Sequence, residues 1–328
     1  TSRAYHNNIL GPYMNFITDL FKYDKILPMN TGVEAGETAI KIARKWGYNY
    51  KNVPENKAEI IFPTNNFWGR TITACSTSTN ISCYNQFGPF TDGFDIVPYN
   101  NIEKLEDKFF KNPNIVAYML EPIQGEAGII IPYNGYLRDV KYLCEKYNIL
   151  MIADEVQTGL GRTGKLLACD YEDVKPDILC LGKALSGGYM PISAVLANNN
   201  IMKYITPGTH GSTFGGNPLA CSIAIEALKI INDEKLVENS YNMGEYFRKE
   251  LKNIKNNNII DIRGKGLLNA IELKNEIIAN KFCNNLIENG LLTSITHGNI
   301  IRLSPPLIIN INEINKSLDI ILKSLKYI

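Results

Sequence analysis

The sequence predicts an α/β fold with a mainly parallel central sheet flanked by helices, followed by a smaller α+β domain. Two observations support this prediction. Over the first two thirds of the chain, apolar runs of strand length alternate with stretches of helical periodicity, which is typical of a parallel sheet. After Asn217 this alternation stops, and a mostly helical stretch leads into a short mixed region. A chain of 328 residues has room for one large domain or two ordinary ones.

The first two thirds begin with an amphipathic helix over residues 8–23 and a short strand over 25–29. Thr31 and Glu34 then have the spacing of a capping box, which predicts a helix from this point to about Tyr48. The remaining expected elements are helices over 102–111 and 136–147 and strands over 59–62, 95–98, 115–120, 149–153, 177–181 and 192–196.

The last third of the chain lacks the regular alternation of strand-length runs and helical stretches. It is expected to be mostly helical over 217–253, with further amphipathic helices over 276–289 and 312–326 and strands over 267–273 and 300–303. We therefore divide the chain into a large domain, residues 1–228, and a small C-terminal domain, residues 229–328.

Composition excludes several classes of protein. Lys and Arg number 34 and Asp and Glu 33, so the chain has no net field that would attract nucleic acid or an anionic membrane. No apolar run approaches the roughly 18 residues of a membrane span. The three histidines lie far apart in sequence, and we expect no metal site. Seven cysteines without a CxxC pair indicate buried thiols in a reducing compartment.

The first chemical feature is Asp154, which follows the apolar strand over 149–153. An acidic residue there also fits a nucleotide hydrolase, and a near match to a phosphate-binding loop appears at residues 159–165. However, Leu166 stands where that loop needs a hydroxyl for the metal. We therefore interpret it as a false match.

The second feature is Lys183, which follows the strand over 177–181 among small residues. A lysine buried there would have a lowered pKa and could attack a carbonyl as a nucleophile. The start of the helix at Gly32 and Val33 and the run from His210 to Pro218 both offer donors for an anion. Each feature alone fits an ordinary turn or helix start. Together they supply a lysine, a phosphate site and an acid, which pyridoxal 5′-phosphate (PLP) requires.

At this point the sequence resembles the class III (ω-amino acid) aminotransferases, which are fold-type I PLP enzymes, and within them the branch that acts on ornithine. The resemblance covers the whole chain. It rests on IADEVQTGLGRTG and PDILCLGKALSGG within residues 152–188, and on segments at 30–39, 66–71, 121–128, 210–219, 263–270 and 296–307.

The resemblance implies a role for each matching residue around the cofactor. Lys183 would bind the PLP aldehyde as a Schiff base and then move the substrate proton, and Asp154 would face the ring nitrogen. Gln157 would bond the ring's phenolic oxygen, with Val156 and Phe67 on the two ring faces. Gly32 and Val33 would bind the phosphate, and Ser212 and Thr213 would reach the phosphate of a partner subunit, which implies a homodimer with shared sites.

The resemblance also implies how substrates are chosen. The δ-amino group of ornithine would pass to 2-oxoglutarate in a ping-pong reaction that gives glutamate 5-semialdehyde and glutamate. Arg70, beside Trp68, would bind the far carboxylate, and Arg302 would bind the α-carboxylate of glutamate-type substrates. Glu126 would mask Arg302 while ornithine is bound.

Three matters stay open on the sequence. The donor could instead be acetylornithine, 4-aminobutyrate or another ω-amino acid, or the chain could hold PLP without catalysis. Cys75 and Cys83 flank a polar loop near Arg70 and could form a redox pair, against the alternative of two unrelated thiols. Family members begin with a segment not seen before Thr1 that supports substrate and partner binding. Without a visible leader we expect a cytoplasmic protein, with the mitochondrial matrix as the alternative.

Overall fold

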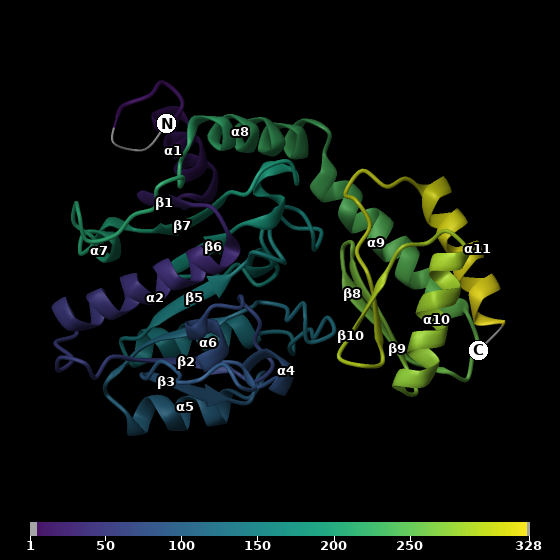
Figure 1. Ribbon diagram of the computed structural model, residues 1–328, viewed down its shortest axis with the longest axis horizontal. Helices are drawn as coiled ribbons and strands as arrows, with labels where there is room; N and C mark the ends of the chain where they lie inside the picture. The colour runs from purple at the N-terminus through teal and green to yellow at the C-terminus, as the bar shows by residue number, and fades with distance from the viewer. Residues whose placement is uncertain (1–4, 327–328) are drawn as a thin grey trace. The chain divides into compact units, whose positions relative to one another are not determined.

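The computed structural model describes residues 5–326, which form two compact units (Figure 1). The larger unit runs to Pro122 and includes Pro132–Gln157 and Cys169–Lys229. The smaller unit comprises Ile123–Ile131, Thr158–Ala168 and the chain from Ile230 onward. The division predicted between residues 228 and 229 remains a prediction. It differs from these units in the two short segments, which it places in the larger part, and at Lys229, which it places in the smaller part.

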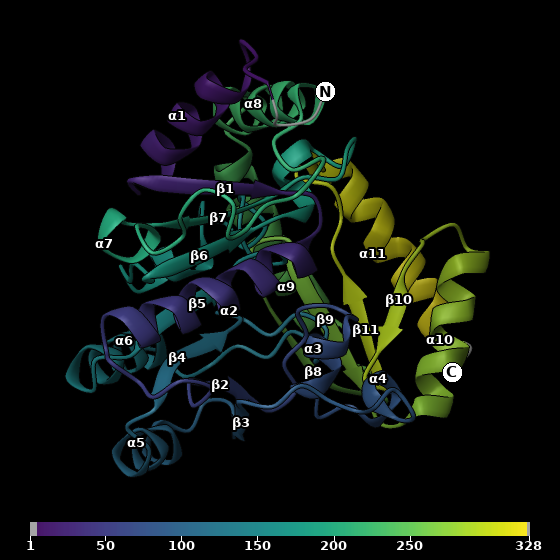
Figure 2. The same ribbon diagram turned by 60° about the vertical axis from the view of Figure 1, so that its left-hand side comes forward.

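The larger unit is built on a seven-stranded sheet in the order β1-β7-β6-β5-β4-β2-β3, which Figure 2 shows from β1 to β3. All neighbouring pairs are parallel except those that β7 makes with β1 and β6. The predicted α/β class with a mainly parallel sheet is confirmed. The strands are β1 Lys25–Met29, β2 Glu59–Pro63, β3 Phe94–Val97, β4 Ile115–Leu120, β5 Leu150–Asp154, β6 Ile178–Leu181 and β7 Ser193–Ala197.

Helices cover both faces of this sheet because alternate strand residues point to opposite sides. In β5, Leu150 and Ile152 pack with α2 (Gly32–Asn49), whereas Met151 and Ala153 pack with α5 (Ile102–Lys111) and α6 (Tyr136–Lys146). Buried on both faces, the strand reads as a continuous apolar run. The other helices are α1 Leu10–Phe21, α3 Ile72–Ser76, α4 Ile81–Tyr84, α7 Asn199–Met202 and the 3₁₀ turns η1 Ala168–Tyr171 and η2 Lys183–Ser186.

The smaller unit has an antiparallel sheet with the order β10-β11-β9-β8. Its strands are β8 Ile259–Lys265, β9 Leu268–Leu273, β10 Ser294–Thr296 and β11 Ile300–Leu303, and its helices are α9 Leu236–Asn253, α10 Glu276–Glu288 and α11 Ile311–Leu325. The helix α8, Pro218–Asp233, runs across the boundary between the units.

The two faces of the small sheet have different neighbours. Ile301 and Leu303 pack with the three helices, while Ile300 packs with the segment Ile123–Ile131. On the helical side α9 touches the turn between β8 and β9 so closely that a Cβ on Gly244 would lie 1.8 Å from the carbonyl oxygen of Gly266. Only a glycine fits at position 244.

The stretch expected to be mostly helical over 217–253 consists of two helices, α8 and α9, separated near Lys235, whose φ is +51°. The strands β8 and β10 were missed. In β8 only Ile262 is buried, so the apolar alternation that marks a strand is absent. None of the helices among the described residues is long and apolar enough to cross a membrane.

Candidate active site

The candidate catalytic residues lie at the carboxyl edge of the larger sheet. Asp154 is the last residue of β5, and Lys183 begins the turn after β6. Because β4, β5 and β6 are parallel neighbours, their carboxyl ends meet at one edge, where open α/β sheets bind ligands. The charge of Lys183 acts on Asp154, so the structure brings these two predicted residues together.

Asp154 is a buried carboxylate, with 5% of its surface exposed. Burial raises its pKa to about 6, against the opposing effects of a hydrogen bond from the Val156 amide (3.0 Å) and the charge of Lys183. A carboxylate in this position is stabilised by a further cation. A protonated pyridine nitrogen is such a cation.

Lys183 differs from the expectation of a buried amine, because the structure leaves it exposed. It follows the strand end in a short 3₁₀ turn with a φ of +42°, and the neighbouring Gly182, Gly187 and Gly188 have no side chains to cover it. The strand end therefore places an accessible amine beside a buried acid.

A small pocket joins Asp154 to the loop after β2. Its lining includes Phe67, Trp68, Glu121 and Asp154. Trp68 is also part of the core: its indole donates a 2.8 Å hydrogen bond to Thr77 Oγ1 and stacks on Phe62. Phe67 is half-buried, so its ring remains available to a ligand.

Glu121 is a site residue that the sequence analysis did not single out. It is 3% exposed; its Oε1 accepts a hydrogen bond from the amide of Phe67 (3.0 Å) and its Oε2 one from Nε2 of Gln157 (3.4 Å). It thus ties two of the predicted cofactor-binding residues together. The signal that could have found it is its position directly after β4, which matches that of Asp154 at the end of β5.

The start of α2 has the geometry of an anion site. Thr31 caps the helix, accepting from the Glu34 amide, and Glu34 binds back to the amides of Asn30 and Thr31. Within residues 5–326, no acceptor is bonded to the amides of Gly32 and Val33. These amides lie beside Val156, whose Cγ1 would be 2.8 Å from a Cβ on Gly32.

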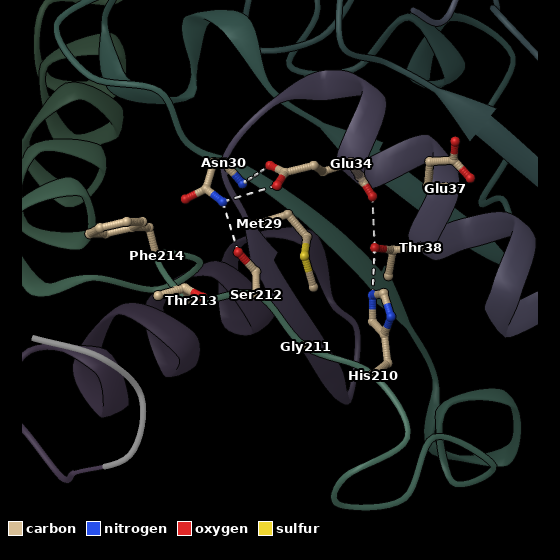
Figure 3. A pocket seen from close by; sticks show the side chains of 10 residues that line it. All are labelled: Met29, Asn30, Glu34, Glu37, Thr38, His210, Gly211, Ser212, Thr213 and Phe214. Atoms are coloured by element: carbon tan, nitrogen blue, oxygen red, sulfur yellow. Dashed lines mark hydrogen bonds between the residues drawn. The ribbon is translucent and has the colours of Figure 1, made fainter. Parts of the chain in front are cut away.

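The run from His210 onward lies against the same helix (Figure 3). It lines a pocket of about 390 Å³ with Asn30, Glu34 and Thr38. Ser212 Oγ accepts a 2.8 Å hydrogen bond from Asn30 Nδ2, while Thr213 is exposed. His210 Nε2 lies 2.8 Å from Thr38 Oγ1.

The remaining substrate candidates lie in two places. Arg70 is exposed on the larger unit, with its guanidinium over the ring of Phe67, and no carboxylate of the described chain pairs with it. In the smaller unit Arg302 Nη1 lies 3.0 Å from Glu126 Oε2, so these two residues form an ion pair and are not separate surface charges.

The cysteines and the near match to a nucleotide loop have simple structures. Cys75 and Cys83 are buried free thiols, and Cys75 Sγ donates to the carbonyl of Cys83 at 3.0 Å. The loop at 159–165 consists of turns with no α-helix after it, so it lacks the strand–loop–helix context of a nucleotide site. Residues 5–326 contain no group of three or more His, Cys, Asp or Glu that could hold a metal ion.

Comparison with known proteins agrees with this geometry. The family model for aminotransferase class-III matches residues 1–325, and the chain belongs to this family. It is 56% identical to the mitochondrial ornithine aminotransferase of Drosophila melanogaster, over 99% of this chain and 75% of that protein.

Two solved structures are also similar. One is an ornithine aminotransferase of Toxoplasma gondii, described with partial occupancy of PLP at its active site: 50% identity, a TM-score of 0.96, 99% of this chain and 78% of that chain. The other is an acetylornithine aminotransferase of Elizabethkingia anophelis: 50% identity, a TM-score of 0.90, 100% of this chain and 81% of that chain.

PLP is the cofactor, and the residues present fit it. The buried carboxylate of Asp154 suits a ring cation, the amides of Gly32 and Val33 suit a phosphate, and the accessible amine of Lys183 suits an aldehyde.

Proposed function

We propose that this chain transfers the δ-amino group of ornithine to 2-oxoglutarate in a ping-pong reaction, giving glutamate 5-semialdehyde and glutamate. The observation that supports this most directly is the Arg302–Glu126 ion pair, because it gives one enzyme two ways to treat the carboxylate end of a substrate. The identity to ornithine aminotransferases over nearly the whole chain supports the same assignment.

The chain's residues divide the chemistry among them. When bound, PLP supplies an aldehyde for amines and a cationic ring that withdraws electrons from the reacting carbon. Nζ of Lys183 removes the proton from Cδ of ornithine. The Asp154 carboxylate keeps the ring nitrogen protonated, since a buried anion stabilises a cation in contact with it. Val156 and Phe67 would enclose the ring, and Gln157 would bond its phenolic oxygen.

Substrate choice depends on three charged residues. Arg70 binds the α-carboxylate of ornithine, so the δ-amine reaches the reacting position. Arg302 stays paired with Glu126 meanwhile. A diacid such as 2-oxoglutarate displaces Glu126 and binds Arg302 through its α-carboxylate, since a guanidinium binds carboxylates in a bidentate way.

A homodimer with shared sites is part of this proposal. Gly32 and Val33 bind the phosphate of their own subunit, and Ser212 and Thr213 complete the phosphate site of the partner. The exposure of Thr213 and of Phe214, 65% exposed, supports a contact outside the chain. A loss of activity on dilution, parallel to dissociation in sedimentation, tests it.

A donor panel tests the function itself. The purified chain, supplied with PLP, is assayed with ornithine, acetylornithine and 4-aminobutyrate, with 2-oxoglutarate as acceptor. We expect kcat/KM to be highest for ornithine. A preference for acetylornithine would favour the alternative donor, which the similarity to the Elizabethkingia anophelis protein supports. A cofactor band that ornithine does not change would indicate a non-catalytic PLP protein.

We also propose that Cys75 and Cys83 form a redox pair. Arg70 Nη1 lies 4.0 Å from Cys83 Sγ, so oxidation of this sulfur would alter the surroundings of the guanidinium that is proposed to bind ornithine. Oxidation by a low-molecular-weight disulfide would join the two sulfurs. The oxidant would take up the two electrons and two protons that the thiols lose, and would be reduced to two thiols. Assays of Cys75→Ser and Cys83→Ser with and without reductant decide this. A response identical to that of the unmodified chain would exclude the switch.

The cellular location remains a proposal as well. We propose the cytoplasm, with the mitochondrial matrix as the alternative; the Drosophila melanogaster relative is named as mitochondrial. Fractionation of the source cells, with an antibody to the chain, distinguishes the two.

A further inference from the structure

The two partners of the Arg302–Glu126 ion pair are held in different ways. Arg302 lies in β11, paired with Ser294 on one side and Ala270 on the other. Glu126 lies at the tip of a short loop that Gln124 and Ile130 close through two main-chain hydrogen bonds of 3.1 and 2.9 Å. The ladder fixes the main chain of Arg302, and the main-chain position of Glu126 depends on what holds its loop.

Two side chains of the small sheet bind carbonyl groups in this tip. The hydroxyl of Thr296, at the end of β10, donates to the main-chain oxygen of Glu126. The guanidinium of Arg263, in β8, donates to the oxygens of Gly128 (2.8 Å from Nη2, 3.0 Å from Nε) and Ile129 (3.1 Å). We call Thr296 and Arg263 the loop clamp.

Arg263 is itself held in place. Its Nη1 lies 2.6 Å from Glu272 and 2.8 Å from Asp261, so its side chain has one arrangement in which both carboxylates and both loop carbonyls are satisfied. A lysine has a single ammonium and cannot reproduce this fork of donors.

Close packing removes the remaining freedom of the loop main chain. Gly128 has a φ of +104°, and a Cβ there would lie 2.3 Å from Cδ1 of Ile300. Ile300 precedes Arg302 by two residues, so both side chains leave β11 on the face that the loop covers. Ile129 is fully buried against this face.

With both main chains held, the ion pair opens through its side chains, of which that of Glu126 is the more exposed (40% against 29% for Arg302). The clamp and the packing fix the main chain of Glu126, whereas its side chain is 40% exposed and has room to rotate. A substrate that binds Arg302 through an α-carboxylate needs this residue uncovered. The apparent affinity for such a substrate is therefore proportional to the fraction of molecules in which Arg302 is uncovered.

We propose that Thr296 and Arg263 are positioning residues that hold the main chain of Glu126 so that its carboxylate covers Arg302, and that they thereby set the preference for δ-amino over α-amino donors. The inference rests on the proposed function. The loop clamp touches neither the substrate nor the cofactor and acts only through Glu126.

The test compares two donors in single half-reactions of the PLP-loaded enzyme. Stopped-flow absorbance of the cofactor gives kcat/KM for ornithine and for glutamate. Thr296→Val removes one hydrogen bond, so the ratio of ornithine to glutamate should fall about tenfold, mainly through a lower KM for glutamate. Thr296→Ser keeps the hydroxyl and should restore the ratio. Arg263→Lys should shift it in the same direction.

Thr293→Val is the matched control. It removes an equivalent hydroxyl bond on the same hairpin, of 2.7 Å to the carbonyl of Arg302, which the ladder holds on both sides. In this variant kcat/KM for ornithine and kcat/KM for glutamate should change by the same factor, so that their ratio stays constant. An unchanged ratio in Thr296→Val, or an equal shift in Thr293→Val, overturns the proposal.

Two further outcomes are separable from these. If Thr296→Val does not fold, as thermal denaturation would show, Arg263→Lys decides the question alone. If the unmodified enzyme does not react with ornithine, the proposed function fails. The clamp would then still be judged by whether Thr296→Val changes the affinity for glutamate, measured from the cofactor spectrum.

Discussion

Asp154 in the larger unit and Glu126 in the smaller unit are both acidic site residues, but the fold holds them in opposite ways. Asp154 ends a buried strand and is 5% exposed. Glu126 lies on a loop tip, its side chain is 40% exposed, and its partner Arg302 is the residue proposed to bind the α-carboxylate of substrates. A buried charge requires a permanent counter-charge, whereas a half-exposed ion pair contributes little net stability and can be exchanged. We call the sheet edge around Asp154 and Lys183 the permanent edge, because the charge of Asp154 needs a lasting partner. We call the Glu126–Arg302 pair the switch, because its partners can be exchanged.

The largest effect should follow from a change at the permanent edge. Lys183→Ala removes the amine that is proposed both to bind the cofactor aldehyde and to move the substrate proton. We expect overall turnover to fall by about 10⁴-fold or more, since a positioned general base alone contributes roughly 10²–10⁴. Coupled assays measure this loss.

The matched control is Lys165→Ala, in the loop that resembles a nucleotide site; it should retain turnover. Borohydride reduction and peptide mapping provide an independent readout, with the pyridoxyl group expected on Lys183. A pyridoxyl group on another lysine would show that Lys183 is not the residue that binds PLP.

Asp154→Asn should sharpen the comparison through its dependence on pH. Folding raises the pKa of this carboxyl from 3.8 to about 6, because burial disfavours its charge. The folded cofactor-free protein therefore binds this proton more tightly than the unfolded chain, and stability falls as pH rises from about 4 to 6. By pH 8 this cost is roughly 3 kcal/mol at most.

The variant should recover this cost. We expect Asp154→Asn to raise the free energy of unfolding of the cofactor-free protein at pH 8, and by about half as much at pH 5. With PLP bound it should instead lose roughly 10²–10⁴ in turnover, as for a broken buried ion pair. Chemical denaturation at both pH values checks the first result; an equal gain at both would show that Asp154 is not the group responsible.

Arg302→Lys tests the exchangeable region. A lysine keeps the charge but loses the planar fork, so we expect KM for 2-oxoglutarate to rise by roughly 10- to 100-fold. The ornithine half-reaction should change by less than about threefold, because in the proposed mechanism Arg302 stays paired with Glu126 during that step. Separate kinetics of the two half-reactions make the comparison. A similar loss in both would mean that the two regions are not functionally distinct.

The smallest effect should come from Glu121, which belongs to the permanent edge but acts through its neighbours. Glu121→Gln keeps the shape, and its amide oxygen can still accept from the Phe67 amide, but the charge-assisted bond from Gln157 weakens. We expect an approximately tenfold weaker retention of PLP with kcat nearly unchanged. Dialysis against buffer without cofactor measures retention. A fall in kcat without loss of PLP would instead place Glu121 in direct contact with the substrate.

Much of the sheet edge that carries Asp154 and Lys183 could be predicted from the sequence, but little of the Glu126–Arg302 pair could. The strand over 115–120 and the helix over 102–111 match β4 and α5 residue for residue. Asp154 and Lys183 stood out because each follows a buried strand; Lys183 was expected to be buried, and the structure leaves it exposed. The edge strand β8 was missed because it buries only Ile262. Glu126 and Arg302 are 176 residues apart, and no local pattern connects them, so only the family resemblance suggested the pair.

The contact between Gly244 and the Gly266 carbonyl has a consequence for large-scale mutagenesis. Any side chain at position 244 would push α9 away from the β8–β9 turn, so every substitution there should score as severely as the loss of a reactive group. A melting temperature recorded beside each activity would separate the two cases: position 244 would fail in both measurements, and Lys183 in only one.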